Sequence, residues 1–174
     1  MLIATALLCS GCIVLSMHPA YDDATIAWDE TLLGTWRAPE DNVEVSIERG
    51  EWRSYRVQYR HPVEVRDFTG HLTMIGDAYF LDLMAPRGVD HGAALVPAHL
   101  ILRLQRDGAR WVVSQLDYDA ARATMKSGKP YGPGAVFDQR QYVVLTEPTE
   151  ALRRWLQARP AVDFGSGTVF ERTR

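Results

Sequence analysis

The stretch Thr31-Leu32-Leu33-Gly34-Thr35-Trp36-Arg37 decides the fold, because the pattern of apolar and polar residues changes there. Before it lie an apolar leader and a polar segment that Pro19 interrupts. After it, apolar and polar residues alternate in short runs, which is typical of half-buried β-strands. We therefore predict that this stretch opens the first strand of an antiparallel barrel, with the Trp36 side chain closing one end.

Length and composition favour one globular domain and argue against nucleic acid as a partner. The chain has 174 residues, of which 47% are hydrophobic and 24% are charged, so one buried core is expected. Its net charge is −3, and Lys and Arg are spread along the sequence. We therefore expect no basic face of the kind that binds phosphates.

The strands expected after Gly34 are visible as a period of two. In the run 43–48, for example, Val43, Val45 and Ile47 alternate with polar residues. The apolar residues of the run 63–75 change sides, which predicts a bulge or bend at Gly70. Other strands are expected over 54–59, 79–83, 100–105, 111–113, 142–145 and 168–172.

Two helices are expected among these strands. Residues 119–126 are rich in Ala and begin with Asp119, a suitable N-cap. Residues 146–159 start with Thr146 or Thr149 as the cap, and contain one apolar stripe. That stripe consists of Leu152, Trp155 and Leu156. The predicted fold is thus mainly β: one lipocalin-like antiparallel barrel of about eight to nine strands, a short helix, and a C-terminal helix before the last strand.

The first residues are expected to be processed and are not part of the barrel. Residues 1–11 are apolar and uncharged, but a membrane-spanning helix needs about 20 such residues. They are therefore interpreted as a signal peptide. Residues 12–30 are expected to form a tether that packs on the domain through Tyr21, Ile26 and Trp28, and residues 31–174 to form the barrel.

The segment Leu8-Cys9-Ser10-Gly11-Cys12 resembles the lipobox of bacterial lipoproteins. That resemblance implies that Cys12 is diacylated and becomes the new N-terminus, which makes the lipid bilayer a partner. Because Ile13 follows the cysteine, the sorting rules of that family imply the periplasmic face of the outer membrane. The alternative interpretation is an ordinary leader, or an N-terminal strand in which the two cysteines have no function.

The order of strands, helix and closing strand, together with Gly34-Thr35-Trp36, resembles the lipocalins and related calycins. In that family the tryptophan covers the closed end of the barrel, and a basic residue of the last strand packs across its ring. Arg172 is the candidate for this contact, with Arg174 as the fallback. The whole chain also resembles a set of uncharacterised bacterial lipoproteins, which implies no particular activity.

Residues with reactive side chains do not form a recognisable catalytic or metal motif in this sequence. The histidines lack the tight spacing of a zinc site, and no cofactor motif is found. His71 is interpreted as a wall residue, and His99 as a flanking residue of a solvated loop. Asp82 alternates with Leu81 and Leu83, so we expect its side chain to face water. Enzymatic activity is therefore not expected.

Two functions remain open. The favoured one is binding of a small apolar ligand inside the barrel, and the alternative is a structural or interaction role for a filled barrel. Counting alternate hairpins from Trp36 places the long loop 85–98 at the open end. Four residues of this loop are the candidate ligand contacts: Val89, His91, Leu95 and Val96.

Overall fold

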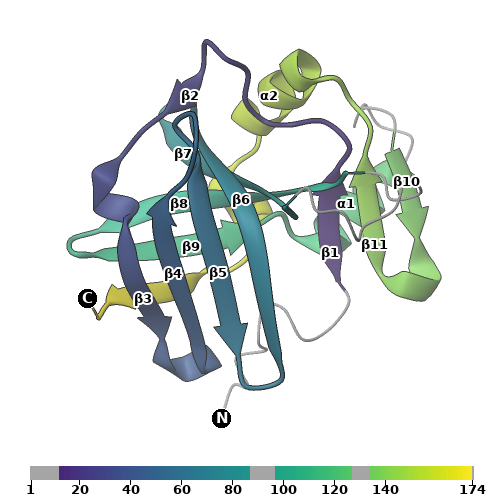
Figure 1. The fold of residues 1–174 in the computed structure, drawn as a ribbon. Coiled ribbons are helices and arrows are strands. Elements are labelled where there is room, and N and C mark those ends of the chain that lie inside the picture. The colour runs from purple at the N-terminus through teal and green to yellow at the C-terminus, as the bar shows by residue number, and fades with distance from the viewer. Residues whose placement is uncertain (1–11, 87–96, 127–133, 174) are drawn as a thin grey trace.

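Antiparallel strands dominate the structure, and eight of them close into a barrel (Figure 1). The computed structural model describes residues 12–86, 97–126 and 134–173. Strands β3 to β9 pair in sequence order, and β12 closes the ring between β9 and β3. The barrel strands are β3 (Gly34–Ala38), β4 (Val43–Arg49), β5 (Tyr55–His61), β6 (Glu64–Ile75), β7 (Ala78–Met84), β8 (His99–Asp107), β9 (Arg110–Gln115) and β12 (Thr168–Arg172). This confirms the predicted mainly β fold, which is compatible with a lipocalin-like barrel.

Three further strands form an extension beside the barrel (Figure 1). They are β1 (Ile13–Ser16), β10 (Gly134–Phe137) and β11 (Tyr142–Leu145). The β8–β9 ladder reaches back only to Leu102, so the first residues of β8 keep a free edge, and Ser16 pairs there with His99. Two expectations were therefore wrong: the strand over 142–145 lies outside the closed ring, and residues 13–16 form a strand instead of irregular tether.

Short elements connect and cover the sheet. Strand β2 (Ile26–Ala27) pairs with β6. The 3-10 turns within the described ranges are η1 (Glu30–Leu32), η2 (Pro39–Asp41), η4 (Asp138–Arg140) and η5 (Ala161–Asp163).

Both expected helices form, as α1 (Tyr118–Lys126) and α2 (Thr149–Gln157), but their caps differ from the expectation. In α1 the capping carboxylate belongs to Asp117, whose Oδ1 accepts a hydrogen bond from the Ala120 amide at 2.7 Å. In α2 the cap position is occupied by Pro148, and therefore by neither threonine. The predicted apolar stripe of α2 is confirmed, because Leu152 and Leu156 are buried.

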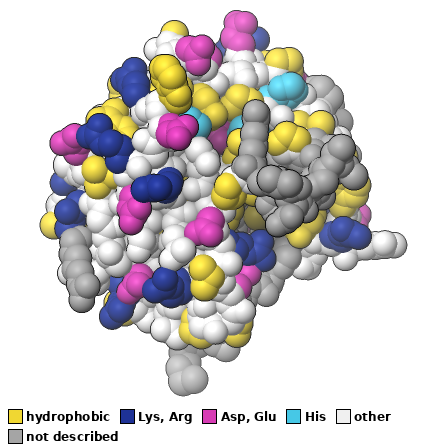
Figure 2. Space-filling view, in the orientation of Figure 1, with side chains coloured by type: hydrophobic (Ala, Val, Ile, Leu, Met, Phe, Trp, Pro, Cys, Tyr) yellow, Lys and Arg dark blue, Asp and Glu magenta, His cyan; other side chains and the backbone are white. Residues whose placement is uncertain are grey.

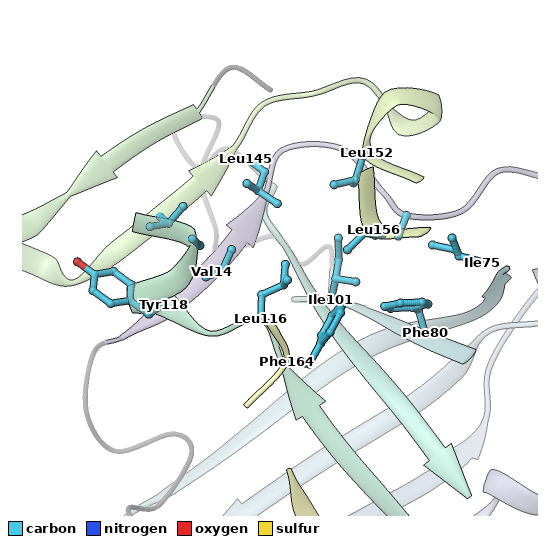
Figure 3. Packing of buried hydrophobic residues seen from close by; sticks show 13 residues of the cluster. Val14, Ile75, Phe80, Ile101, Leu116, Tyr118, Leu145, Leu152, Leu156 and Phe164 are labelled. Carbon is cyan, nitrogen blue, oxygen red and sulfur yellow. The ribbon is translucent and has the colours of Figure 1, made fainter. Parts of the chain in front are cut away.

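A second core lies outside the barrel, between β7–β8 and the elements that cover them. Figure 3 shows Leu152 and Leu156 of α2 beside Phe80 of β7 and Ile101 of β8. Phe164 joins this cluster with its ring centroid 5.7 Å from that of Phe80. The outer face of β7 is thus as buried as its inner face, which a pattern of alternation does not reveal.

The long strand β6 runs through Gly70 without the expected bulge. Gly70 pairs with Tyr55 on one side and with Leu83 on the other, and both ladders keep their register. The apolar residues change sides because the covering layer changes along the strand: Val65 is exposed, whereas Ile75 lies in the outer core. Gly70 meets a packing requirement, since a Cβ there would lie 3.1 Å from the Leu83 side chain.

Candidate functional site

The barrel encloses a cavity of about 460 Å³. This volume lies within the range of small-molecule pockets, roughly 300–1,000 Å³. Its walls are almost entirely aliphatic and aromatic, and every strand of the ring contributes to them. The apolar wall residues include Trp36, Val45, Ile47, Val57, Tyr59, Phe68, Leu81, Leu83, Leu100, Leu102, Leu104, Trp111, Val113 and Phe170.

Trp36 lies at the end of the cavity that is closed. Its side chain is 4% exposed, and its indole N–H donates to the Leu32 carbonyl at 2.8 Å. The guanidinium carbon of Arg172 lies 4.8 Å from the Trp36 ring centroid, as the resemblance to lipocalins implies. Gly34 begins the strand with a φ of 127°, which side-chain-bearing residues rarely adopt. The described motif residues thus meet at one end of the barrel.

A second arginine covers a second tryptophan at this closed end. Arg106 lies 5.2 Å from the centroid of Trp111, its cross-strand neighbour, and donates to the Thr31 hydroxyl at 2.7 Å. This pair was missed from the sequence. The sequence does contain a signal for it, because Asp107-Gly108 is typical of a two-residue hairpin turn, and such a turn places Arg106 opposite Trp111.

The open end of the cavity has a polar rim. Glu64 and Arg66 both line it and form an ion pair at 2.7 Å, while the Thr168 hydroxyl donates to Asp41 at 2.9 Å. Ala85 and Ala98, the first and last residues of the long loop, also line the cavity. The four predicted ligand contacts, Val89, His91, Leu95 and Val96, lie outside the described residues.

Cys12, the predicted lipidation residue, lies beside the cavity. It is half-buried, forms no disulfide with another described residue, and lines the cavity together with Ile13 and Leu15. Ile13 pairs with Tyr142 of β11, which is another lining residue. The sequence did not reveal this position, because a parallel pairing over some 130 intervening residues has no local signature.

Asp82 and His99 form a buried pair on the outer face of the barrel, which corrects both expectations for these residues. Asp82 is 1% exposed, and its Oδ1 lies 2.6 Å from His99 Nδ1. Its other oxygen, Oδ2, accepts a hydrogen bond from the Ala20 amide at 2.7 Å. The side chain points outward as alternation requires, but the N-terminal segment covers it and keeps water away.

Residues around this pair hold the N-terminal segment in place. Arg153 of α2 donates to the Ala20 carbonyl at 2.6 Å and to the Thr73 hydroxyl at 2.9 Å. His71 stacks on Tyr21 with centroids 4.2 Å apart, and burial lowers the pKa of His71, although the charge of Asp82 acts in the opposite direction.

The contacts of the Asp82–His99 pair indicate a structural role. Ser16 lies opposite His99 in the ladder, but its hydroxyl donates to the His18 carbonyl at 2.7 Å. A nucleophile activated by histidine would instead donate its proton to the ring. The pair therefore serves the covering segment, whose Ala20 amide it binds.

Neither metal ligation nor a transmembrane helix emerges from the described part of the chain. Among residues 12–86, 97–126 and 134–173, no three His, Cys, Asp or Glu side chains gather closely enough to hold an ion. No helix in these ranges is both long and apolar enough to span a membrane. On the face drawn in Figure 2, positive and negative side chains are interspersed.

Comparisons with known proteins provide no function for this chain, so its function has to be inferred from the candidate site. A scan against protein-family models, a search of curated proteins and a search of solved structures found no match.

Proposed function

We propose that this protein is a bacterial envelope lipoprotein whose barrel binds one small apolar ligand. The observation that carries the proposal is the cavity of about 460 Å³, with apolar walls, a closed end at Trp36 and a polar rim. An apolar molecule gains free energy when it leaves water for such walls. A filled structural barrel, the alternative function, would leave no room of this size.

The lipid anchor is proposed on Cys12, after removal of residues 1–11. Support comes from the resemblance of residues 8–12 to a lipobox, and the proposed location is the periplasmic face of the outer membrane. Replacing Cys12 with Ala should release the protein from the membrane fraction or leave the precursor uncut, whereas Cys9→Ala should leave anchoring unchanged. A Cys12→Ala protein that stays membrane-bound at the mature mass would contradict the anchor.

Native mass spectrometry tests the ligand. Protein purified from the host envelope in a mild detergent should carry an additional mass that organic solvent extracts. A polypeptide that shows only the mass of the chain and its anchor, in repeated preparations, would favour the structural alternative. The measurement also gives the mass of the ligand, and therefore its chemical class.

A further inference from the structure

We propose that the open end of the barrel rests on the bilayer and that the cavity takes up an acyl chain of a membrane phospholipid from there. The inference rests on the proposed lipidation of Cys12 and deepens the proposed function by naming the ligand and its source. Its first support is that Cys12 itself lines the cavity, together with rim residues such as Glu64 and Arg66.

The anchor has almost no freedom to move away from this opening. Ile13, the next residue, already belongs to β1 and pairs in register with Tyr142 of β11. The parallel β1–β11 ladder continues for four residue pairs, from Ile13 to Ser16. Acyl chains on the Cys12 sulfur would therefore enter the membrane directly beside the rim, which brings the open end to the lipid surface.

Exposed apolar side chains surround the same end. Val63, in the turn between β5 and β6, is 78% exposed and lies next to the rim residue Glu64. Phe137 and Tyr142 are paired across β10 and β11, in the row that continues to Ile13, and are 50% and 36% exposed. Aromatic rings of this kind are enriched where proteins meet the membrane–water interface.

The distribution of polar and apolar groups in the cavity matches that of a phospholipid with one acyl chain inside. Its walls are almost entirely apolar, whereas charges of both signs lie at the rim, where Arg66 keeps 63% of its side chain exposed. An acyl chain in the cavity would leave its phosphate and head group beside these charges. A ligand of uniform apolar character would make no use of the rim.

Site-specific fluorescence tests the orientation. The lipidated protein is placed on vesicles of phosphatidylethanolamine and phosphatidylglycerol, with an environment-sensitive dye on Val63→Cys or, as the matched control, on Trp52→Cys in the β4–β5 turn at the closed end. Lipids carrying a nitroxide on the acyl chain should quench the dye at residue 63 severalfold more than the dye at residue 52. Equal quenching, or stronger quenching at residue 52, would overturn the proposed orientation.

Transfer of a phospholipid with a pyrene-labelled acyl chain, from the same vesicles, tests the ligand. Val45→Trp fills the cavity and Ala98→Trp narrows the rim, so each should reduce uptake severalfold. Val169→Trp, on the exposed outer side of β12, should take up lipid as the wild type does. Unchanged uptake in both obstructed variants would exclude the cavity as the lipid site.

The readouts separate this inference from the proposed function. Acylated Cys12 has no free thiol, so a dye that reacts at Cys12 in the envelope-purified protein would overturn the anchor and, with it, the proposed orientation. An acylated protein whose two dyes are quenched equally would contradict the orientation alone. A bound apolar molecule that is not a phospholipid would leave the proposed function intact and overturn the proposed ligand.

Discussion

The guanidinium of Arg172 lies 4.8 Å from the Trp36 ring centroid and also donates hydrogen bonds to the carbonyls of Thr31 and Leu33, at 2.7 and 2.8 Å. One side chain of the last strand thus joins the first strand of the barrel to the segment before it. Trp36 completes the arrangement by donating to the Leu32 carbonyl. The closed end is therefore held by contacts between residues some 140 positions apart in the chain.

Replacing Arg172 with Ala should destabilise the protein by about 1–3 kcal/mol, because a cation–π contact and two charged hydrogen bonds disappear together. Arg172→Lys should recover only part of this, since an ammonium lacks the planar fork of the guanidinium. Urea unfolding measures both changes. The control is Arg56→Ala, which breaks an exposed ion pair with Glu48 and should cost under about 1 kcal/mol. Equal effects at both arginines would contradict the role assigned to Arg172.

Replacing Trp36 with Ala should cost about 3–5 kcal/mol, the usual range for a buried large aromatic side chain. Trp52→Ala is the matched control, because that side chain is 91% exposed and its loss should change the free energy of unfolding by no more than about 0.5 kcal/mol. Thermal and urea unfolding of both variants make the comparison. A Trp36→Ala protein that melts with the wild type would show that Trp36 does not close the barrel.

Local patterns were enough to predict the barrel strands, whereas of the two arginine–tryptophan pairs at the closed end only Arg172 with Trp36 was predicted, from the resemblance to lipocalins. Alternation marks a strand with one solvent-exposed face, and Arg172 of the last strand could be aligned with Trp36 through the resemblance of the chain to known barrels. The same reasoning failed at Asp82, because alternation reports which face a side chain takes and not what covers that face. The covering segment, residues 13–20, is joined to β7 and β8 only by long-range contacts.

A ligand cavity inside the barrel was predicted, but only some of its lining residues could be identified from the sequence. The inward residues of each strand follow from alternation, so Leu81, Leu83 and Leu100 could be placed on the wall. Cys12 could not, because its position depends on β1 joining β11 instead of remaining a tether. The pairing of two strands that are far apart in the sequence produces no periodic pattern in either strand.

Introducing a methyl group at Gly70 should destabilise the barrel by about 1–3 kcal/mol through overpacking. The new Cβ would lie 3.1 Å from Leu83 Cδ2 and 3.3 Å from Val57 Cγ2, both of which line the cavity. Urea unfolding of Gly70→Ala measures the cost. A neutral or stabilising result would show that these side chains have room to move into the cavity.

The stability of the protein should fall between pH 7.5 and pH 5.5 in part because of His71. Burial lowers the pKa of His71 below its ordinary value of 6.5. As the pH falls through that value, the unfolded chain binds a proton that the folded protein resists, so the free energy of unfolding decreases. His71→Phe retains a ring against Tyr21 and removes the titration, so unfolding measured at both pH values should show a shallower dependence. An unchanged dependence would assign the effect to other groups.

Replacing Asp82 with Asn should destabilise the protein by about 1–3 kcal/mol, because one charged carboxylate serves both His99 and the Ala20 amide. An amide keeps only one of the two carboxylate oxygens, so at least one of these two contacts loses its oxygen. The matched control is Asp67→Asn: its carboxylate is exposed and accepts from Gln58 at 3.0 Å, so the change should stay within about 0.5 kcal/mol.

Hydrogen exchange gives the local readout for the Asp82 variant. The Ala20 amide is fully buried and bonded to Asp82 Oδ2, so its exchange in the wild type requires the covering segment to open. In Asp82→Asn this amide should exchange faster than the loss of global stability alone explains, while amides in the β4–β5 ladder follow the global change. If Ala20 retains its protection relative to that ladder, the segment is held by Arg153 and not by the Asp82–His99 pair.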